Sequence, residues 1–108
     1  MTTTIAFAEN LLPLVEDGRK SITISKGKRE YAEVLTVTDP GGAVQPYQIK
    51  VNCQYQYPAS LILERHIQMD GFLDLEDMVE GMQSFYPDFG PDTDCTVVLF
   101  ERIPNPSR

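Results

Sequence analysis

The sequence is poor in the residues that build metal sites and disulfide frameworks. Its 108 residues include one histidine, two cysteines and no tryptophan. Cys53 and Cys95 stand far apart and form no CxxC pair, whereas a structural zinc site needs four nitrogen or sulfur ligands. We therefore expect no metal and no cofactor. The two cysteines are interpreted as small buried thiols in a reducing cytoplasm.

Long apolar runs are also missing. A stretch of about 18 apolar residues would be needed to span a membrane, and none is present, so we expect no membrane association. The N-terminus lacks the basic region and apolar core of a secretory signal, and the expected location is the cytoplasm. The length suits one domain over residues 1–108, ordered over about residues 5–102, with a flexible tail at 103–108.

Positive charge is scarce. Nine Lys and Arg residues stand against sixteen Asp and Glu residues, which gives a net charge of −7. A protein with this charge repels polyanions, so broad nucleic-acid binding through phosphates is disfavoured. Five of the nine cations nevertheless fall between positions 19 and 29, and we interpret them as a local positive rim around a pocket. Nine of the acids fall between Glu64 and Asp94, as is typical of a solvated helix surface.

Hydrophobic periodicity and turn residues divide the chain into helices and strands. After a loose start, a helix over residues 9–17 ends at Gly18, which can take a positive φ. Strands are predicted over residues 21–25, 31–38, 44–57 and 94–102. Two more helices are predicted over residues 61–67 and 74–86, with Ser60 as the N-cap of the first. This order indicates an α+β fold.

The stretch from Asp17 to Ser25 places two cations and three hydroxyl groups where the first helix gives way to a strand. The alternation sends Ile22 and Ile24 to one face and the hydroxyl side chains to the other. Lys20 and Thr23 are three positions apart, so an unbroken strand would send their side chains to opposite faces. They converge only if Lys20 belongs to the turn. In a pocket, a lysine amine can act as a base that activates a hydroxyl or a water. A surface lysine and an ordinary strand threonine are the alternative interpretation.

This stretch also carries a resemblance to a known family. Residues Gly18–Ile24, which read GRKSITI, resemble the GRKTITIR signature of the small single-domain ASCH proteins. The resemblance is closest to the bacterial N(4)-acetylcytidine amidohydrolases and extends from about Phe7 to Phe100. It implies a small PUA-like β-barrel with helices flanking one opening. It also implies hydrolysis of the amide that joins an acetyl group to a modified nucleoside.

The resemblance assigns roles to individual residues. The matching lysine and threonine, Lys20 and Thr23, are catalytic in that family together with a glutamate after the mid-chain helix. Here the turn is one residue shorter, and Asp70 is the carboxylate available for this role. Its alternative is to end the helix together with Gly71. Substrate binding is assigned to four residues: Arg19, Ser21, Ser25 and Lys26. Ser25 occupies the position at which the family has an arginine.

Two function classes remain open at this stage. The first is an amidohydrolase whose partner is a small modified nucleoside, and the second is a non-catalytic RNA-binding or nucleoside-binding ASCH module. Net charge disfavours RNA, and the sequence does not give the oligomeric state. His66 is interpreted as a structural residue whose protonation a helix C-terminus would favour. Several aromatic side chains offer stacking surfaces or belong to the core: Tyr47, Tyr55, Tyr57, Phe85 and Tyr86.

Overall fold

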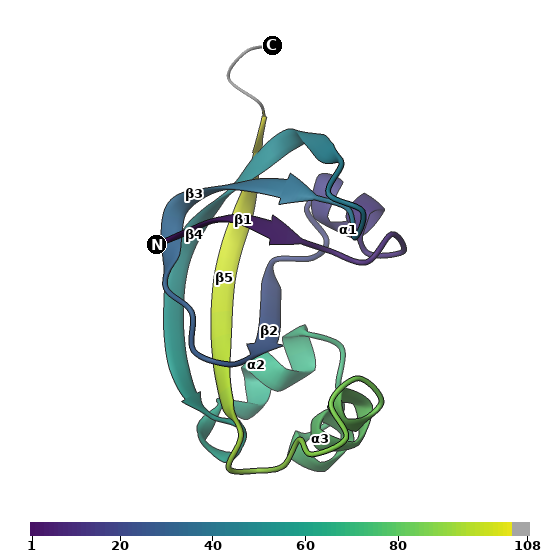
Figure 1. Ribbon diagram of the computed structural model, residues 1–108, viewed down its shortest axis with the longest axis vertical. Coiled ribbons are helices and arrows are strands. Elements are labelled where there is room, and N and C mark those ends of the chain that lie inside the picture. Colours follow the sequence, from purple (N-terminus) through teal and green to yellow (C-terminus); the bar gives the residue numbers. More distant parts are fainter. Residues whose placement is uncertain (105–108) are drawn as a thin grey trace. The chain divides into compact units, whose positions relative to one another are not determined.

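The computed structural model describes residues 1–104 (Figure 1). Within this range the strands are β1 (Thr2–Ala6), β2 (Ile22–Lys26), β3 (Tyr31–Thr38), β4 (Val44–Pro58) and β5 (Asp94–Pro104). The helices are α1 (Leu12–Glu16), α2 (Glu64–Met69) and α3 (Leu75–Gln83), with a 3-10 turn η1 at Ala59–Leu61. Hydrogen bonds join the strands in the order β1-β3-β4-β5-β2. The α+β class is therefore confirmed.

The chain divides into two compact units. The first comprises Met1–Ser21, Arg29–Gln54 and the chain from Val98 onward. The second comprises Ile22–Lys28 and Tyr55–Val97. Strands β4 and β5 run through both units, so neither unit is a separate stretch of sequence.

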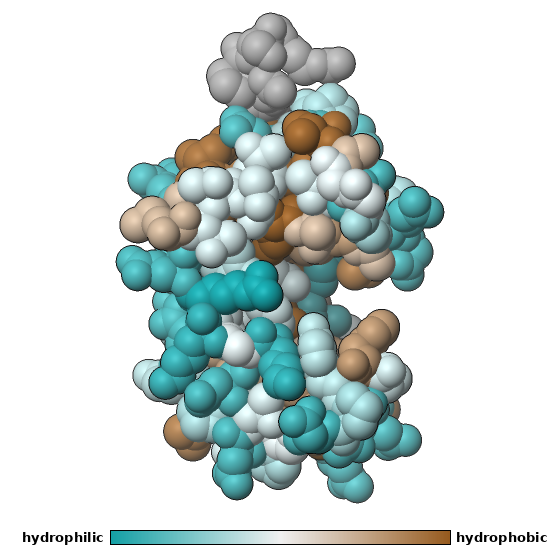
Figure 2. Space-filling model, in the orientation of Figure 1, coloured by the Kyte–Doolittle hydropathy of each residue, from teal (hydrophilic) through white to brown (hydrophobic). Residues whose placement is uncertain are grey.

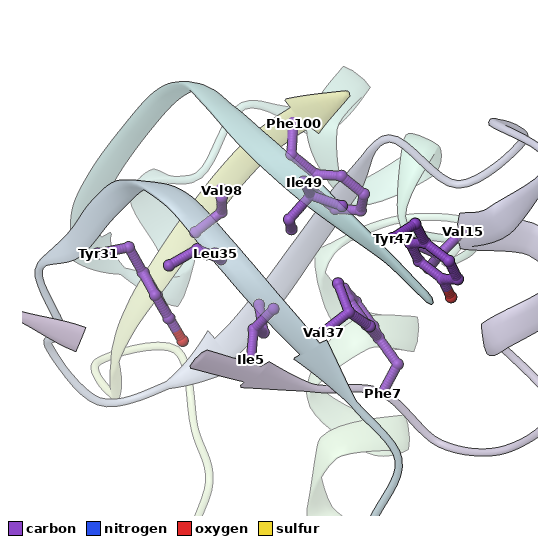
Figure 3. Packing of buried hydrophobic residues seen from close by; sticks show 10 residues of the cluster. All are labelled: Ile5, Phe7, Val15, Tyr31, Leu35, Val37, Tyr47, Ile49, Val98 and Phe100. Atoms are coloured by element: carbon purple, nitrogen blue, oxygen red, sulfur yellow. The ribbon is translucent and has the colours of Figure 1, made fainter. Parts of the chain in front are cut away.

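The first unit has a core built by strands and one short helix. Figure 3 shows side chains from β1, α1, β3, β4 and β5 meeting in a single apolar cluster. Tyr47 is buried within it, and its hydroxyl donates a hydrogen bond to the carbonyl of Leu12 at 3.2 Å. The cluster consists of Ile5, Phe7, Val15, Tyr31, Leu35, Val37, Tyr47, Ile49, Val98 and Phe100. Tyr47 is therefore a core residue and not a stacking surface.

The N-terminal segment differs from the prediction of a loose start. Thr2–Ala6 forms β1, which pairs in parallel with β3, with Ile5 opposite Val37 (Figure 1). Ile5 and Phe7 are buried, as their apolar character indicated. The strand was missed because its partner lies some thirty residues away, and a parallel pair leaves no turn signal between its members.

The second unit buries side chains from β2, η1, α2, α3 and β5. Helix α2 contacts both β2 and α3, and α3 contacts η1. Asp74, where the helix was predicted to begin, is the N-cap of α3: its Oδ1 accepts the N–H of Asp77 at 2.9 Å. Ser60 does not cap α2: it lies within η1, and Leu63 holds the N-cap position without a side-chain hydrogen bond. A single turn of 3-10 helix separates the strand from α2.

The C-terminal strand is longer than expected. β5 continues to Pro104, so it includes the first two residues of the predicted tail, and the rest of that tail lies outside the described residues. None of the helices in residues 1–104 is long and apolar enough to cross a membrane. The same part of the chain contains no cluster of three or more His, Cys, Asp or Glu residues that could hold a metal ion.

The two cysteines have different environments. Cys95 is fully buried in β5, as predicted, but Cys53 is exposed. The prediction that both thiols are buried is therefore wrong for Cys53, which lies on β4 beyond the residues that pack on the apolar cluster. Burial, with a smaller effect of the Asp94 charge, raises the pKa of the Cys95 thiol to about 11.

This difference predicts the reactivity of the thiols. The thiolate is the reactive form of cysteine, and the burial that raises the pKa of Cys95 also shields it from reagents. We expect an aromatic disulfide reagent at pH 8 to label one thiol in the native protein and two in 6 M guanidinium. Cys53→Ser should leave no rapidly labelled thiol, and Cys95→Ser should leave the fast reaction unchanged. Rapid labelling of Cys95 in the native protein would contradict its burial.

Candidate functional site

The turn after α1 holds Lys20 outside the following strand. Gly18 adopts φ +82°, and its N–H donates to the carbonyl of Val15 at 3.2 Å, which ends the helix. The N–H of Lys20 donates to the carbonyl of Leu14 at 2.9 Å. β2 begins only at Ile22. Lys20 therefore belongs to the turn, which is the condition that its convergence with Thr23 required.

Lys20 borders a hollow on the surface of the first unit. The hollow has a volume of about 300 Å³ and is lined by both acidic and basic side chains. Ser21 also lines it, and its carbonyl accepts the N–H of Phe100 at 2.8 Å, which joins the end of the turn to β5. The remaining lining residues are Glu16, Asp17, Gly18, Phe100, Glu101 and Arg102. Two of the predicted residues, Lys20 and Ser21, thus share one depression in this unit.

Arg19 forms a local ion pair. Its Nη2 lies 2.6 Å from Oδ2 of Asp17, and its Nε and backbone N–H donate to the same carboxylate at 2.7 and 3.0 Å. These hydrogen bonds lower the pKa of Asp17 and raise that of Arg19. The pair is largely exposed to solvent, so it contributes little to stability. A substrate would have to compete with Asp17 for this guanidinium.

Strand β2 presents its hydroxyl groups opposite a buried row. Ile22 and Ile24 are buried, and Thr23 and Ser25 on the other face are half-buried, as the alternation predicted. The Oγ of Ser25 is inaccessible to solvent and has no hydrogen-bond partner among the described residues. A buried hydroxyl without a partner is unfavourable.

The isolated Ser25 hydroxyl leads to a stability prediction. Ser25→Ala removes the buried polar group, and we expect the free energy of unfolding to rise by about 1 kcal/mol. Ser84 supplies the matched control, because its Oγ donates to the carbonyl of Gly81 at 2.7 Å. Ser84→Ala should shift stability the other way by about 0.5–1 kcal/mol. Urea unfolding of both variants measures the difference, and a less stable Ser25→Ala protein would show that the hydroxyl has a partner.

The cations at the end of β2 and just after it form ion pairs with acidic residues of the second unit. Lys26 Nζ lies 3.6 Å from Oδ1 of Asp88 and 5.0 Å from the centre of the Tyr86 ring. Lys28 Nζ lies 4.0 Å from Oδ2 of Asp94. The expected positive rim is thus compensated at these two positions. On the face drawn in Figure 2, many hydrophilic side chains lie on the surface of the second unit.

Asp70 ends α2 within a well-defined turn. Gly71 has φ +102°, its N–H donates to the carbonyl of Gln68 at 3.0 Å, and the N–H of Phe72 donates to that of Ile67 at 3.2 Å. These two bonds form a Schellman motif, in which a glycine in the left-handed region closes a helix. Asp70 is half-buried and occupies the C-cap position. The predicted helix-ending turn is confirmed, and a catalytic role for Asp70 stays a prediction.

A pair of a half-buried tyrosine and a buried histidine lies one helical turn before Asp70. The hydroxyl of Tyr55 on β4 lies 2.8 Å from Nδ1 of His66 on α2, and the two ring centres are 5.7 Å apart. Only 7% of His66 is exposed. Desolvation, and then the positive charge of Arg65, lower the pKa of His66 below its usual value. The pKa of His66 thus moves in the direction opposite to the one expected from the helix terminus, because desolvation is the largest cause.

The lowered pKa of His66 predicts how stability depends on pH. The folded state disfavours the charged ring, so the stability of the neutral form is fully present above the unfolded pKa of about 6.5 and is lost as pH falls below it. The His66→Asn protein has no group at this position that titrates in this range. We therefore expect the difference in the free energy of unfolding between wild type and His66→Asn to decrease from pH 7.5 to pH 5.5. Urea unfolding at both pH values measures this, since the acidic groups are common to both proteins. A constant difference would contradict the shift.

The predicted site residues are thus distributed over both units. Lys20 and Ser21 line the hollow of the first unit, whereas Thr23, Ser25 and Lys26 lie on β2 in the second unit, where α2 packs against β2 and leads to Asp70. The convergence of Lys20 with Thr23 stays a prediction. The pairing of Tyr55 with His66 was missed, because a strand residue and a helix residue eleven positions apart leave no periodic signal.

Comparison with known proteins identifies the fold. No family model matches the sequence, and no curated protein matches it. Solved structures do match. An ASCH domain from Lactobacillus crispatus JV V101 superposes with a TM-score of 0.66 at 14% identity, covering 95% of this chain and 81% of that one. The chain has an ASCH-type fold.

Two further structures agree with this fold. Protein EF3133 from Enterococcus faecalis V583 superposes with a TM-score of 0.66 at 20% identity, over 96% of this chain and 81% of its own. The ZmASCH protein from Zymomonas mobilis superposes with a TM-score of 0.62 at 11% identity, over 91% of this chain and 66% of its own. The ASCH-type fold that the resemblance implied is therefore confirmed over more than nine tenths of the chain.

Proposed function

We propose that this ASCH-type domain is an amidohydrolase that removes the N-acetyl group from N(4)-acetylcytidine or a related modified nucleoside. The proposal rests on where the structure places the GRKSITI segment, Gly18–Ile24. Lys20 lies in the glycine turn beside a hollow, and the hydroxyl face of β2 follows directly. An ASCH-type fold that spans the chain supports transferring the roles of the resembling family to these positions.

The proposed reaction is transfer of an acyl group to water. The Lys20 amine takes a proton from the Thr23 hydroxyl or from a water, and the resulting oxygen nucleophile attacks the acetyl carbonyl carbon. Asp70 carries a proton to the departing exocyclic amine, so that the C–N bond breaks and cytidine leaves. The acetyl group ends as acetate, directly if water attacks or after hydrolysis of an acyl-threonine. No redox step is involved.

Four other residues are predicted to hold the substrate. Ser21 offers a hydroxyl group to its polar edge, and Arg19 and Lys26 offer positive charge to a developing oxyanion. The Ser25 hydroxyl is inaccessible to solvent, so it would reach a substrate only if β2 moved. Arg19 and Lys26 are already paired with Asp17 and Asp88. Their contribution is therefore expected to be smaller than that of a free cation.

The same ion pairs weigh against the RNA-binding alternative. Among the cations between positions 19 and 29, carboxylate partners are seen for Arg19, Lys26 and Lys28. A phosphate would have to displace that partner in each case, and the net charge of −7 opposes the approach of RNA. A free nucleoside carries no phosphate and meets neither obstacle.

The decisive experiment is to incubate the purified protein with N(4)-acetylcytidine and follow the appearance of cytidine by chromatography. We expect turnover that changes little between 50 and 200 mM salt. In a parallel titration, a labelled single-stranded RNA should bind weakly. RNA binding that falls steeply with salt, together with no cytidine, would favour the non-catalytic module instead.

A further inference from the structure

We propose that Tyr55 and His66 are positioning residues that set the place of the Asp70 carboxylate. This inference rests on the proposed function, because it concerns the orientation of a residue in that same site. It starts from the tyrosine–histidine pair, which no part of the proposed reaction uses.

The geometry connects the pair to Asp70 through one turn of helix. The backbone N–H of Asp70 donates to the carbonyl of His66 at 3.1 Å, so the two residues are joined across the last turn of α2. The His66 ring is in turn bonded at 2.8 Å to the hydroxyl of Tyr55, which stands on β4. A chain of two hydrogen bonds therefore runs from the long strand to the residue that carries the carboxylate.

Helix α2 needs such an anchor. It has only six residues, and its N-cap, Leu63, provides no side-chain hydrogen bond. Helices of this length are not stable by propensity alone and depend on tertiary contacts. At the other end, the Schellman motif around Gly71 fixes the backbone after Asp70. The bond from Tyr55 to the buried His66 ring supplies the link between this helix end and β4.

The protonation state of the pair follows from its surroundings. Burial lowers the pKa of His66, and in the neutral ring with its proton on Nε2 the hydroxyl of Tyr55 donates and Nδ1 accepts. Loss of the hydroxyl leaves Nδ1 without this donor and lets the ring rotate. A catalytic group that moves by about 1 Å can lose up to 10²-fold in rate. The effect should appear in kcat, since substrate binding is assigned to other residues.

The test is a double-mutant cycle between Tyr55→Phe and Asp70→Asn, assayed on N(4)-acetylcytidine. In the wild-type background we expect Tyr55→Phe to lower kcat by about 10-fold with little change in KM. In the Asp70→Asn background the same substitution should change kcat less than about 2-fold, because the group that it positions is gone. Thermal unfolding of each variant confirms that it is folded at the assay temperature.

Further variants separate positioning from general stability. His66→Asn keeps an acceptor near the place of Nδ1 and should recover most of the kcat that His66→Leu loses. Tyr47→Phe is the matched control, since it removes another buried tyrosine hydroxyl bond, 3.2 Å to Leu12. Whatever its effect on kcat, that effect should be the same in both Asp70 backgrounds.

The outcomes distinguish the two claims. Wild-type protein that releases no cytidine would refute the proposed function, and this inference with it. Wild-type turnover with equal effects of Tyr55→Phe in both backgrounds would refute only the positioning role. Unchanged kcat in Tyr55→Phe would do the same.

Discussion

Replacing Lys20 with alanine should lower kcat/KM for N(4)-acetylcytidine by about 10²- to 10⁴-fold, the scale expected when a proton-transfer group is lost. The substitution removes the proposed base and leaves the backbone that shapes the turn. It is the Lys20 N–H, and not the side chain, that donates to the Leu14 carbonyl at 2.9 Å. Lys20 also lies outside the apolar cluster of its unit, so the variant should fold normally.

Two companion variants make the Lys20 result specific. Lys20→Arg keeps the positive charge, but a guanidinium does not release its proton near neutral pH, so activity should stay low if the amine is a base. Recovery in Lys20→Arg would instead indicate electrostatic stabilisation of the substrate. Lys50→Ala, which removes a lysine from β4, should leave turnover within about 2-fold. Full activity in Lys20→Ala would refute the catalytic assignment.

The elements that the sequence predicted well are those with strong local signals. Tyr31–Thr38 was predicted with the bounds that the structure gives, because its alternation is bounded by a polar loop and the Asp39–Gly42 turn. Gly18 and Gly71 both adopt positive φ where a helix ends. Asp74 caps α3 through a bond three residues away. Each of these features depends on residues that are neighbours in the chain, so the pattern alone was sufficient.

The features that were missed depend on contacts between distant residues. β1 exists because Thr2–Ala6 finds β3, and Cys53 is exposed because it lies on β4 beyond the residues that pack on the apolar cluster. The partners of Lys26 and His66 lie on other elements, at Asp88 and Tyr55. Periodicity gives the face on which a side chain lies, but it does not give the group that it meets there.

The candidate site likewise contains features that local sequence signals predict and features that depend on contacts between distant residues. The place of Lys20 in the turn follows from Gly18, a local signal, and the structure confirms it. The hydroxyl face of β2 follows from alternation and is confirmed by the burial of Ile22 and Ile24. The partner of Lys26, Asp88, could not be predicted, because an ion pair between distant positions depends on where an acidic residue lies after folding. Substrate-binding assignments are thus weaker than those for Lys20 and Thr23.

Asp70→Asn should lower kcat by about 10²-fold or more, because asparagine has nearly the same shape but cannot carry a proton to the leaving amine. The turn itself should persist, since Gly71 and the backbone bonds to Gln68 and Ile67 are unchanged. Asp70→Glu restores the longer carboxylate of the resembling family and should retain more activity than Asp70→Asn. Asp92→Asn, which removes an exposed acid of the same unit, should stay within about 2-fold of wild type. Steady-state kinetics on N(4)-acetylcytidine with matched thermal melts decides the matter: equal kcat for Asp70→Asn and wild type would leave Asp70 as a helix-ending residue only.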